Sequence, residues 1–351
     1  MRTLYIECNM GAAGDMLLAA LYELLEDKSA FLDTMNGLGL PGVHLEAVPG
    51  TTCGIAGTHM RVTVHGEEEH EPAAGHGHGH AHGHDHAHPH EHAHAHAHHH
   101  ATPGHIAEII DGLTLPDAVK QHARSVYDAI AVAEAKAHGC PVGDVHYHEV
   151  GALDAVADVT GVCYALHLLQ PERVVVSPIH VGSGTVRCAH GVMPVPAPAT
   201  ANLLTGVPIY GGAVQGELCT PTGAALLTHF AASFGPMPVM SVEAAGVGIG
   251  TKTFEQANCV RAFLGETVDE TNGEIVELVC NIDDMTPEAL AFASARLLDL
   301  GALDVYTVPG TMKKGRPGHV LTVLCRREQE GEMARQVLAQ TPTHGLRVRG
   351  C

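Results

Sequence analysis

The pattern of hydrophobic and polar positions divides the first part of the chain into short strands and helices. RTLYIEC (residues 2–8) has the apolar character of a strand, and LLAALYELLED (residues 17–27) has helical periodicity. GVHLEAVP (residues 42–49) and CGIAGTHMRVTVHG (residues 53–66) alternate apolar and polar positions, which predicts the two strands of a hairpin. After an interruption, DAVKQHARSVYDAIAVAEAKAHG (residues 117–139) returns to helical spacing. The interruption is therefore an insertion in one domain.

The second part of the chain continues with short apolar strands that alternate with helices. RVVVSP (residues 173–178) and VPIYGG (residues 207–212) are strand candidates, and CTPTGAALLTHFAASFG (residues 219–235) contains a helical run. This alternation predicts a mixed α/β domain over residues 1–265. The polar residues 266–274 then predict a linker.

Residues 275–351 form a second predicted domain, which has a recognisable order of elements. The pattern is strand, helix, strand, strand, helix, strand, the β-α-β-β-α-β order of ferredoxin-like folds. The overall class is thus α/β (α+β). Because GLRVRG begins the last strand just before the end of the sequence, we expect this domain to be incomplete.

Residues 67–104 are a low-complexity insertion rich in acid, glycine and above all histidine. The tract is internal and has other residues between its histidines, so it does not resemble a purification tag. Neutral imidazoles bind nickel, zinc and copper, so the tract is predicted to load such metals, and an inert solvated linker is the alternative. The candidate ligands are His76, His78, His80, His82, His84, His86, His88, His90, His92, His94, His96, His98, His99 and His100.

Charge is distributed unevenly along the chain. Lys and Arg number 19 against 39 Asp and Glu, and the net charge of −20 argues against generic binding to nucleic acid or to anionic membranes. Eight of the 19 basic residues nevertheless lie between Lys313 and Arg349. A phosphate-bearing ligand is expected in that segment.

The cysteines and the known short motifs exclude several classes of protein. Ten cysteines contain no C-x-x-C pair, so zinc-ribbon and thioredoxin-type sites have no support. With neither a signal peptide nor a membrane-spanning apolar run, reduced thiols in a cytoplasmic protein are expected. The sequence lacks G-x-x-x-x-G-K-[ST], which excludes the His-rich GTPases that load nickel into enzymes.

The segment HYHEVGALDAVAD concentrates titratable side chains ahead of and within a predicted helix. His146 and His148, two residues apart, face one side of an extended segment, and Asp154 and Asp158 share one helix face. Together with Glu149 they are candidates for metal coordination or proton transfer, because acids on an otherwise apolar face are costly to bury without partners. The alternative is a solvated stripe.

Two further segments place glycine turns at the starts of helices. NMGAAGDM offers backbone N–H groups between Gly11 and Gly14 to an anion, and Asp15 could orient a metal or a base. CTPTGAALL places Thr220 and Thr222 as cap or anion contacts. Most turns of this kind are simply helix starts.

We expect one pocket to form where the glycine turn at Gly11 to Gly14 meets the segment HYHE. Strand-to-helix junctions gather along one edge of the sheet in α/β domains, and ligands bind at that edge. The side chains predicted to converge there are Asp15, His146, His148, Glu149 and Asp158.

The C-terminal domain carries acidic and basic residues suited to a metal–nucleotide complex. Asp283 and Asp284 follow its first strand, and the loop MKKGRPG supplies Lys313, Lys314 and Arg316. Carboxylates suit a hard divalent cation, and guanidinium and ammonium groups suit phosphate oxygens. Nucleotide binding is therefore predicted here, against an ordinary charged surface as the alternative.

These motifs together resemble the LarC family of nickel insertion proteins, which build the nickel-pincer cofactor. The resemblance spans nearly the whole chain in order and rests on GAAGDM, HYHEVGALD, SPIHVGSGTV, AHGVMPVPAPAT, GELCTPTGAALL, GVGIGT, NIDDMTPE and MKKGRPG. The resemblance implies a chelatase of the lyase class that inserts nickel into pyridinium-3,5-bisthiocarboxylic acid mononucleotide. It further implies CTP with Mg or Mn, bound by the C-terminal domain, and a product that serves lactate racemase and related enzymes.

The sequence departs from the family in one place, and the resemblance also implies partners. Family C-terminal domains continue beyond the part similar to TPTHGLRVRGC, so the nucleotide site of this chain is expected to be incomplete. A homo-oligomer and contact with the apoenzyme that receives the cofactor are expected.

Two other functions compete with nickel insertion. A nickel store or metallochaperone would act through the His-rich tract, with the α/β body only displaying it. A metal-dependent hydrolase would use His146, His148 and Glu149, but it lacks an obvious nucleophile and a closed ligand set.

Overall fold

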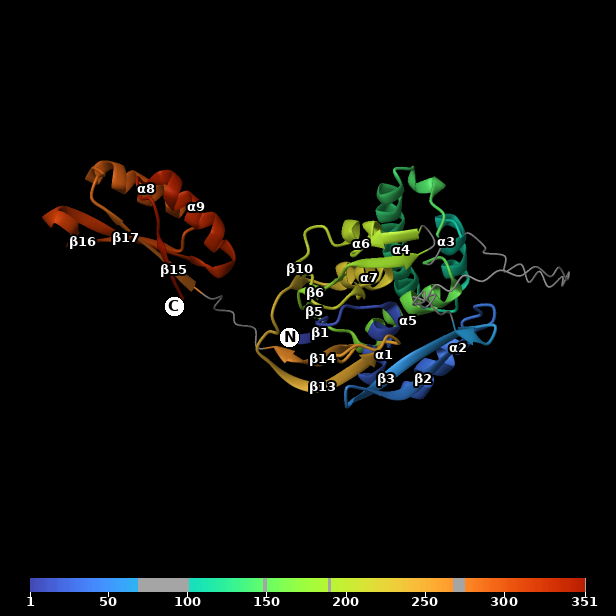
Figure 1. Ribbon diagram of the computed structural model, residues 1–351. Helices are drawn as coiled ribbons and strands as arrows, with labels where there is room; N and C mark the ends of the chain where they lie inside the picture. The colour runs from blue at the N-terminus through green and yellow to red at the C-terminus, as the bar shows by residue number, and fades with distance from the viewer. Residues whose placement is uncertain (69–100, 148–149, 189–190, 268–274, 351) are drawn as a thin grey trace, which may run out of the picture. The chain divides into compact units, whose positions relative to one another are not determined.

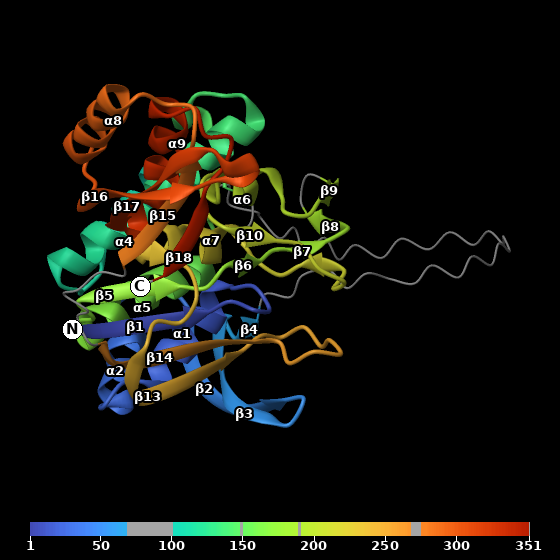
Figure 2. The same ribbon diagram turned by 90° about the vertical axis from the view of Figure 1, so that its left-hand side faces the viewer.

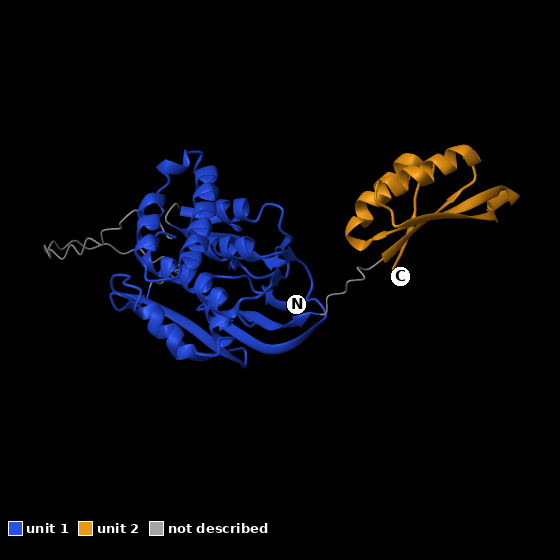
Figure 3. Ribbon diagram, turned by 180° about the vertical axis from the view of Figure 1, so that it is seen from behind, with its two compact units in different colours: residues 1–268 blue, residues 269–351 orange. Residues whose placement is uncertain are grey.

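The protein is described from a computed structural model that covers residues 1–68, 101–147, 150–188, 191–267 and 275–350. The chain divides into two compact units, Met1–Val268 and Asp269–Cys351 (Figure 3). Within the described residues, no helix is long and apolar enough to cross a membrane.

The first unit is a mixed α/β domain, as the alternation of strands and helices predicts (Figure 1). Its helices are α1 (Gly14–Glu23), α2 (Lys28–Asn36), α3 (Pro103–Gly112), α4 (Asp117–His138), η1 (Val142–Asp144), α5 (Leu153–Leu169), α6 (Pro198–Leu203) and α7 (Pro221–Phe230). Its strands are β1 (Arg2–Glu7), β2 (Val43–Thr52), β3 (Ile55–Val64), β4 (Glu67–Glu68), β5 (Arg173–Val176), β6 (Ile179–His180), β7 (Gly182–Ser183), β8 (Thr185–Cys188), β9 (Gly191–Pro194), β10 (Ile209–Tyr210), β11 (Gly216–Glu217), β12 (Ser233–Phe234), β13 (Met240–Ile249) and β14 (Cys259–Thr267).

The main sheet of this unit has the strand order β12-β5-β1-β14-β13-β3-β2, with β4 on β3. β1 is parallel to β5 but antiparallel to β14, so the sheet is mixed. The predicted hairpin is confirmed, because β2 and β3 pair antiparallel from Val43 opposite Val64 to Thr52 opposite Ile55. Strand β1 therefore lies inside the sheet, and the turn that follows it starts from a buried position.

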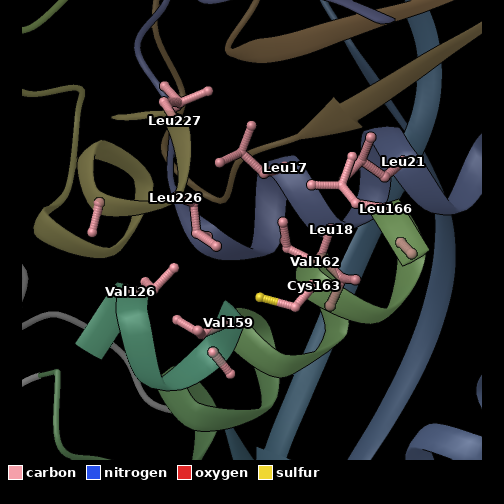
Figure 4. Close-up of a cluster of buried hydrophobic side chains, with 14 of the residues drawn as sticks. Leu17, Leu18, Leu21, Val126, Val159, Val162, Cys163, Leu166, Leu226 and Leu227 are labelled. Atoms are coloured by element: carbon pink, nitrogen blue, oxygen red, sulfur yellow. The ribbon is translucent and has the colours of Figure 1, made fainter. Parts of the chain in front are cut away.

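Four helices bury one shared apolar cluster, which Figure 4 shows in close-up. The labelled side chains come from α1, α4, α5 and α7: Leu17, Leu18, Leu21, Val126, Val159, Val162, Cys163, Leu166, Leu226 and Leu227. Each large side chain of this kind contributes about 1.5–3 kcal/mol when it is fully buried. A Cβ on Gly161 would lie 2.9 Å from Leu18 Cδ1, so this glycine lets α5 approach α1 closely. The cluster thereby fixes the starts of α1, α5 and α7 in one domain.

The second unit is a four-stranded antiparallel sheet with two helices on one face (Figure 1, Figure 2). Its elements are β15 (Ile275–Ile282), α8 (Pro287–Asp299), β16 (Asp304–Thr311), η2 (Lys313–Gly315), β17 (Pro317–Arg326), η3 (Arg327–Gln329), α9 (Glu330–Gln340) and β18 (Arg347–Gly350). The strand order is β16-β17-β15-β18, which gives the β-α-β-β-α-β arrangement of a split βαβ fold. Val276, Leu278, Leu321 and Val323 belong to the core that this sheet shares with the helices.

Two predicted boundaries differ from the structure. The linker was predicted from residue 266, but β14 runs to Thr267, because Glu266 and Thr267 pair with Arg2 of β1 and Met240 of β13. The low-complexity insertion was predicted over residues 67–104, but Glu67 and Glu68 pair with β3. At its other end, Thr102 caps α3, since its hydroxyl accepts a hydrogen bond from the N–H of His105. Residues 69–100 lie outside the described part.

The close contact between α1 and β13 yields a prediction about stability. A Cβ on Gly248 would lie 1.9 Å from the Met16 carbonyl oxygen, whereas one on Gly50 would meet only Ile249 Cδ1 at 3.7 Å. Gly248→Ala should lower the free energy of unfolding by about 3 kcal/mol, because the helix must move off the strand. Gly50→Ala, the matched control in β2, should stay within about 0.5 kcal/mol. Denaturant unfolding measures both, and equal effects would contradict the tight contact.

Candidate functional site

The glycine turn after β1 and the segment CTPTG lie against each other, a contact that was not predicted from the sequence. The Ala12 N–H donates to the Leu218 carbonyl at 3.0 Å, and the Thr220 N–H donates to the Ala12 carbonyl at 3.0 Å. Gly11 has φ +78°, and a Cβ there would lie 2.0 Å from the Leu218 oxygen. Only glycine fits this position. The starts of α1 and α7 are thereby joined through backbone hydrogen bonds.

Thr220 and Thr222 occupy the first turn of α7. The Thr220 hydroxyl accepts a hydrogen bond from the Gly223 N–H at 3.2 Å, which is the N-cap interaction. The two threonine hydroxyls lie 3.0 Å apart. Thr220 is therefore a helix cap, one of the two roles predicted for this motif. It also lies beside the glycine turn.

Two carboxylates from different helices meet at the start of α1. A Cβ on Gly14 would lie 2.8 Å from both Cβ and Oδ2 of Asp158, so the glycine makes room for this side chain from α5. The Asp15 N–H donates a hydrogen bond to the Asp158 carboxylate. Oδ1 of Asp158 is buried and has no hydrogen-bond partner among the described residues. Asp15 and Asp158 are thus the part of the predicted pocket that the structure brings together.

Burial dominates the electrostatics of this carboxylate pair. It raises the pKa of Asp158 well above its ordinary value, and the charges of Asp15 and Asp154 raise it further. Burial also raises the pKa of Asp15, although the imidazole of His59 and N–H groups at the start of α1 oppose the rise. Two such carboxyls share a proton readily, since both cannot easily ionise side by side.

His59 and Glu68 stand near Asp15 and were not predicted from the sequence. The two ring nitrogens of His59 lie 3.1 Å from the Ile249 carbonyl oxygen and 3.2 Å from Glu68 Oε1. Arg61 also reaches Glu68, at 3.6 Å. His59 lies on a strand whose alternating pattern marks it as an ordinary hairpin residue, so the sequence carries no local signal for its role.

The other predicted residues of this pocket are placed differently. His148 and Glu149 lie outside the described residues. His146 is exposed, while Tyr147 beside it is buried and donates a hydrogen bond to the Tyr127 carbonyl at 3.1 Å. Asp154 is half-buried in the first turn of α5, one turn before Asp158.

His180, at the end of β6, is a second buried titratable group that sequence analysis missed. Its N–H donates to the Cys8 carbonyl at 3.2 Å, and its ring stands edge-on to Tyr210 with centroids 4.7 Å apart. The side chain is only 6% exposed and its Nδ1 has no hydrogen-bond partner in the described part. Burial lowers its pKa, which keeps the imidazole neutral. The glycine-rich run after SPIH was the available signal.

A metal centre is not formed by the described side chains alone. Within the described ranges, no group of three or more His, Cys, Asp and Glu residues is arranged to hold a metal ion. The predicted ligands at positions 76–100 lie outside those ranges.

In the second unit, the acidic pair and the basic loop lie at the same end of the sheet. Arg316 Nη1 lies 3.6 Å from Asp283 Oδ2, with the two side chains 61% and 26% exposed, so the ion pair is weak and open to exchange. Lys313 and Lys314 form the short helix η2, where Lys314 has φ +63°. Asp284 is exposed immediately after Asp283.

An open hollow of about 480 Å³ adjoins this acidic segment. It lies between the start of α8 and the end of α9 and is lined by Met285, Thr286, Glu288, Ala289, Phe292, Ala339 and Gln340. Phe292 is 70% exposed. The hollow thus begins directly after the acidic pair in the sequence and is lined by residues of α8 and α9.

The sequence matches one family along nearly the entire chain. The nickel insertion protein family matches residues 4–351, and the chain belongs to this family. It is 39% identical to the pyridinium-3,5-bisthiocarboxylic acid mononucleotide nickel insertion protein of Desulfitobacterium hafniense (strain DSM 10664 / DCB-2), over 99% of this chain and 81% of that protein. The protein of the same name from Acetivibrio thermocellus is 38% identical, with the same coverage.

A solved structure is also similar in sequence to part of the chain. It is the apo form of the C-terminal domain of a cyclometallase involved in the synthesis of the NPN cofactor of lactate racemase. It is 35% identical and covers 22% of this chain and 54% of its own, with a TM-score of 0.22.

The raised pKa of Asp158 predicts how stability depends on pH. Because the folded protein holds this proton more tightly than the unfolded chain, the stability that the group contributes is present below the ordinary carboxyl pKa and is lost as pH rises. Asp158→Asn mimics the protonated acid, so its Tm should exceed that of the wild type increasingly from acid to alkaline pH. The gain should be a few degrees, since ~1 kcal/mol moves Tm by about 2–4 °C in large domains.

Asp33→Asn is the control for this series, because Asp33 is exposed on α2. Its Tm difference from the wild type should not grow with pH. If Asp158→Asn lost stability at alkaline pH, the carboxylate would be ionised and paired in the folded protein, against the assignment made above.

Proposed function

We propose that this chain inserts nickel into pyridinium-3,5-bisthiocarboxylic acid mononucleotide, forming the nickel-pincer cofactor used by lactate racemase and related enzymes. The observation that carries the proposal is the family match over residues 4–351, joined to relatives of that name at 38% and 39% identity. The activity is that of a chelatase of the lyase class, with nickel and the mononucleotide as substrates.

The chemistry requires a base at the site. Nickel(II) takes the two thiocarboxylate sulfurs of the substrate, and a nickel–carbon bond replaces the ring C–H bond between them. The ring carbon keeps the electron pair and releases one proton. A carboxylate whose pKa is raised towards neutrality is a suitable acceptor for that proton.

The Asp15–Asp158 pair supplies such an acceptor. We assign the receiving carboxylate to Asp15, which is half-buried, and the retained proton to Asp158, whose pKa is raised well above its ordinary value. Asp158 then acts as a neutral acid that limits the charge near Asp15. His59 favours the ionised form of Asp15. His146, His148, Glu149 and Asp154 remain candidates for contacts with the metal or the proton.

The substrate also carries a phosphate, and the joined helix starts suit it. Backbone N–H groups at the start of a helix attract an anion, and α1 and α7 begin beside each other here. Gly11 and Gly14 make room for the Leu218 carbonyl and the Asp158 side chain, which brings the two helix starts together. Thr222 adds a hydroxyl to this cradle.

CTP with Mg or Mn is assigned to the second unit. Asp283 and Asp284 would hold the divalent ion, and Lys313, Lys314 and Arg316 would neutralise the phosphates. The support is the 3.6 Å approach of Arg316 to Asp283, which brings opposite charges to one end of the sheet.

The His-rich tract favours a second candidate function, nickel storage or metallochaperone action. Histidines 76–100 would then carry the activity and the α/β body would only display them. A store binds nickel but makes no new nickel–carbon bond, which separates it from an insertase.

The direct test is to incubate the purified chain with nickel, CTP, a divalent ion and the precursor, and to follow the product by mass spectrometry. The insertase should form the nickel adduct with loss of the ring proton. Asp15→Asn should slow the reaction by about 100-fold or more, since a positioned base contributes about 10²–10⁴-fold. The control Asp33→Asn should react at the wild-type rate. Nickel binding without product would leave the storage function.

The nucleotide assignment predicts a separate set of losses. Replacing Asp283 and Asp284 with Asn should weaken CTP binding by about tenfold or more, because the affinity of a site for a divalent ion depends on the number of its charged ligands. Lys313→Ala together with Arg316→Ala should do the same. Calorimetry with CTP and Mg measures both, and Asp299→Asn, an exposed acid at the end of α8, is the control. Unchanged affinity in both variants would move the nucleotide site elsewhere.

A further inference from the structure

A pair of histidines on the first unit has no part in the site described above. His122 lies on α4 and is exposed, and His229 lies in the last turn of α7 and is half-buried. Nδ1 of His122 and Nε2 of His229 are 2.9 Å apart, so one ring donates a hydrogen bond and the other accepts it. The ring centroids are 5.2 Å apart and the planes meet at 70°. The two residues are 107 positions apart in the sequence, so the fold alone brings them together.

We infer that His122 and His229 form a nickel site on the folded body of the protein, distinct from the His-rich tract. The inference rests on the proposed function for the identity of the metal. Imidazole nitrogens are good ligands for nickel(II), and they bind in the neutral form. A bound ion would take the place of the hydrogen that now bridges the rings, and water would fill its remaining positions.

The spacing of the two nitrogens is close to that of two ligands at a right angle on one metal ion. Two nitrogens each about 2.1 Å from a metal lie about 3.0 Å apart when the angle between them is a right angle, but about 3.4 Å apart in a tetrahedron. The observed separation is 2.9 Å. Right-angled coordination, square-planar or octahedral, therefore needs no spreading of the two helices. Each ring has only to turn by roughly 45°, so that its lone pair points at the ion and not at its neighbour.

The surroundings also favour a cation. His229 is at the carboxyl end of α7, where the helix dipole places partial negative charge. The hydrogen bond between the two rings requires that one nitrogen of the pair already presents a lone pair. The basic residues on the same part of α4 are engaged, since Lys120 donates to the Asp111 carbonyl at 3.2 Å and Arg124 pairs with the Asp111 carboxylate.

Helix α7 connects this pair to the carboxylate site. Thr220 caps the start of the helix beside the glycine turn, and His229 is nine residues further on. At 1.5 Å per residue, the pair lies about 14 Å along the helix from that cap. Nickel held there would be on the same rigid helix as the proposed substrate cradle. This position suits an intermediate nickel-binding site that supplies the site of insertion.

Histidine footprinting on the full chain tests the inference with nickel alone. Diethyl pyrocarbonate modifies imidazoles through a free lone pair, so a ring whose lone pair is on a metal does not react. Nickel at about ten times its Kd or more should slow the modification of His122 and His229 by about tenfold or more, because only the unoccupied fraction of the site reacts. His105, exposed on α3, is the internal reference and should change far less.

Two variants show whether the rings act as a pair. His229→Ala should abolish protection of His122, and His122→Ala should abolish protection of His229, whereas His105→Ala should leave both protected. Circular dichroism shows whether each variant is folded. If His229→Ala does not fold, the exposed His122→Ala variant alone tests whether protection needs both rings. Protection of one ring that persists without the other, or no protection in the wild type, would overturn the site. Insertion of nickel by an unprotected wild type would overturn only this site, and protection without any insertion would overturn only the proposed function.

Discussion

The close approach of the turn after β1 to the segment before α7 is the constraint on which the site depends. Gly11 leaves no space for a side chain against the Leu218 carbonyl, and Ala12 exchanges backbone hydrogen bonds with Leu218 and Thr220 on either side. The helices α1 and α7, which start at Gly14 and Pro221, therefore begin beside each other. A larger residue at position 11 would separate them, since the obstacle is backbone and cannot rotate away.

This junction also explains why acids can be buried at it. Two carboxylates near each other lose hydration and repel each other, so their burial costs stability. The start of α1 offsets part of this cost with N–H groups and a favourable dipole, and Gly14 allows Asp158 to approach those groups. What remains is a raised pKa, the property that a base at neutral pH needs. The apolar cluster of α1, α4, α5 and α7 holds this arrangement in place.

The second unit uses charge in a different way. Asp283 and Arg316 are exposed enough for water to screen them, so they add little to stability and remain available to a ligand. The buried pair of the first unit and the exposed pair of the second thus suit different tasks: one holds a proton, and the other exchanges partners. In the proposed function, these tasks are proton transfer in the first unit and nucleotide binding in the second.

Local pattern determined a large part of the structure. The β2–β3 hairpin, the helices α4 and α7 and the succession of C-terminal elements along the chain follow from periodicity, because a strand or a helix must turn one face to the core. The motifs around Gly11, Asp15, Thr220 and Asp283 were also visible as residue types at the ends of elements. Their chemistry was readable because turn glycines and terminal acids have local meaning.

Only the tertiary structure decided which of these groups meet. Asp15 contacts Asp158 across 143 positions of sequence, and His122 contacts His229 across 107. His59 and His180 acquire their importance from burial and from neighbours that lie on other elements. A single sequence does not show which residues of distant elements lie close together. The sequence by itself determined the elements, their faces and the candidate chemistry. The packing of α1, α5 and α7 around one core decided which side chains share a site. Distant segments come close together only when their apolar faces are buried together, and a single sequence does not show which faces those are.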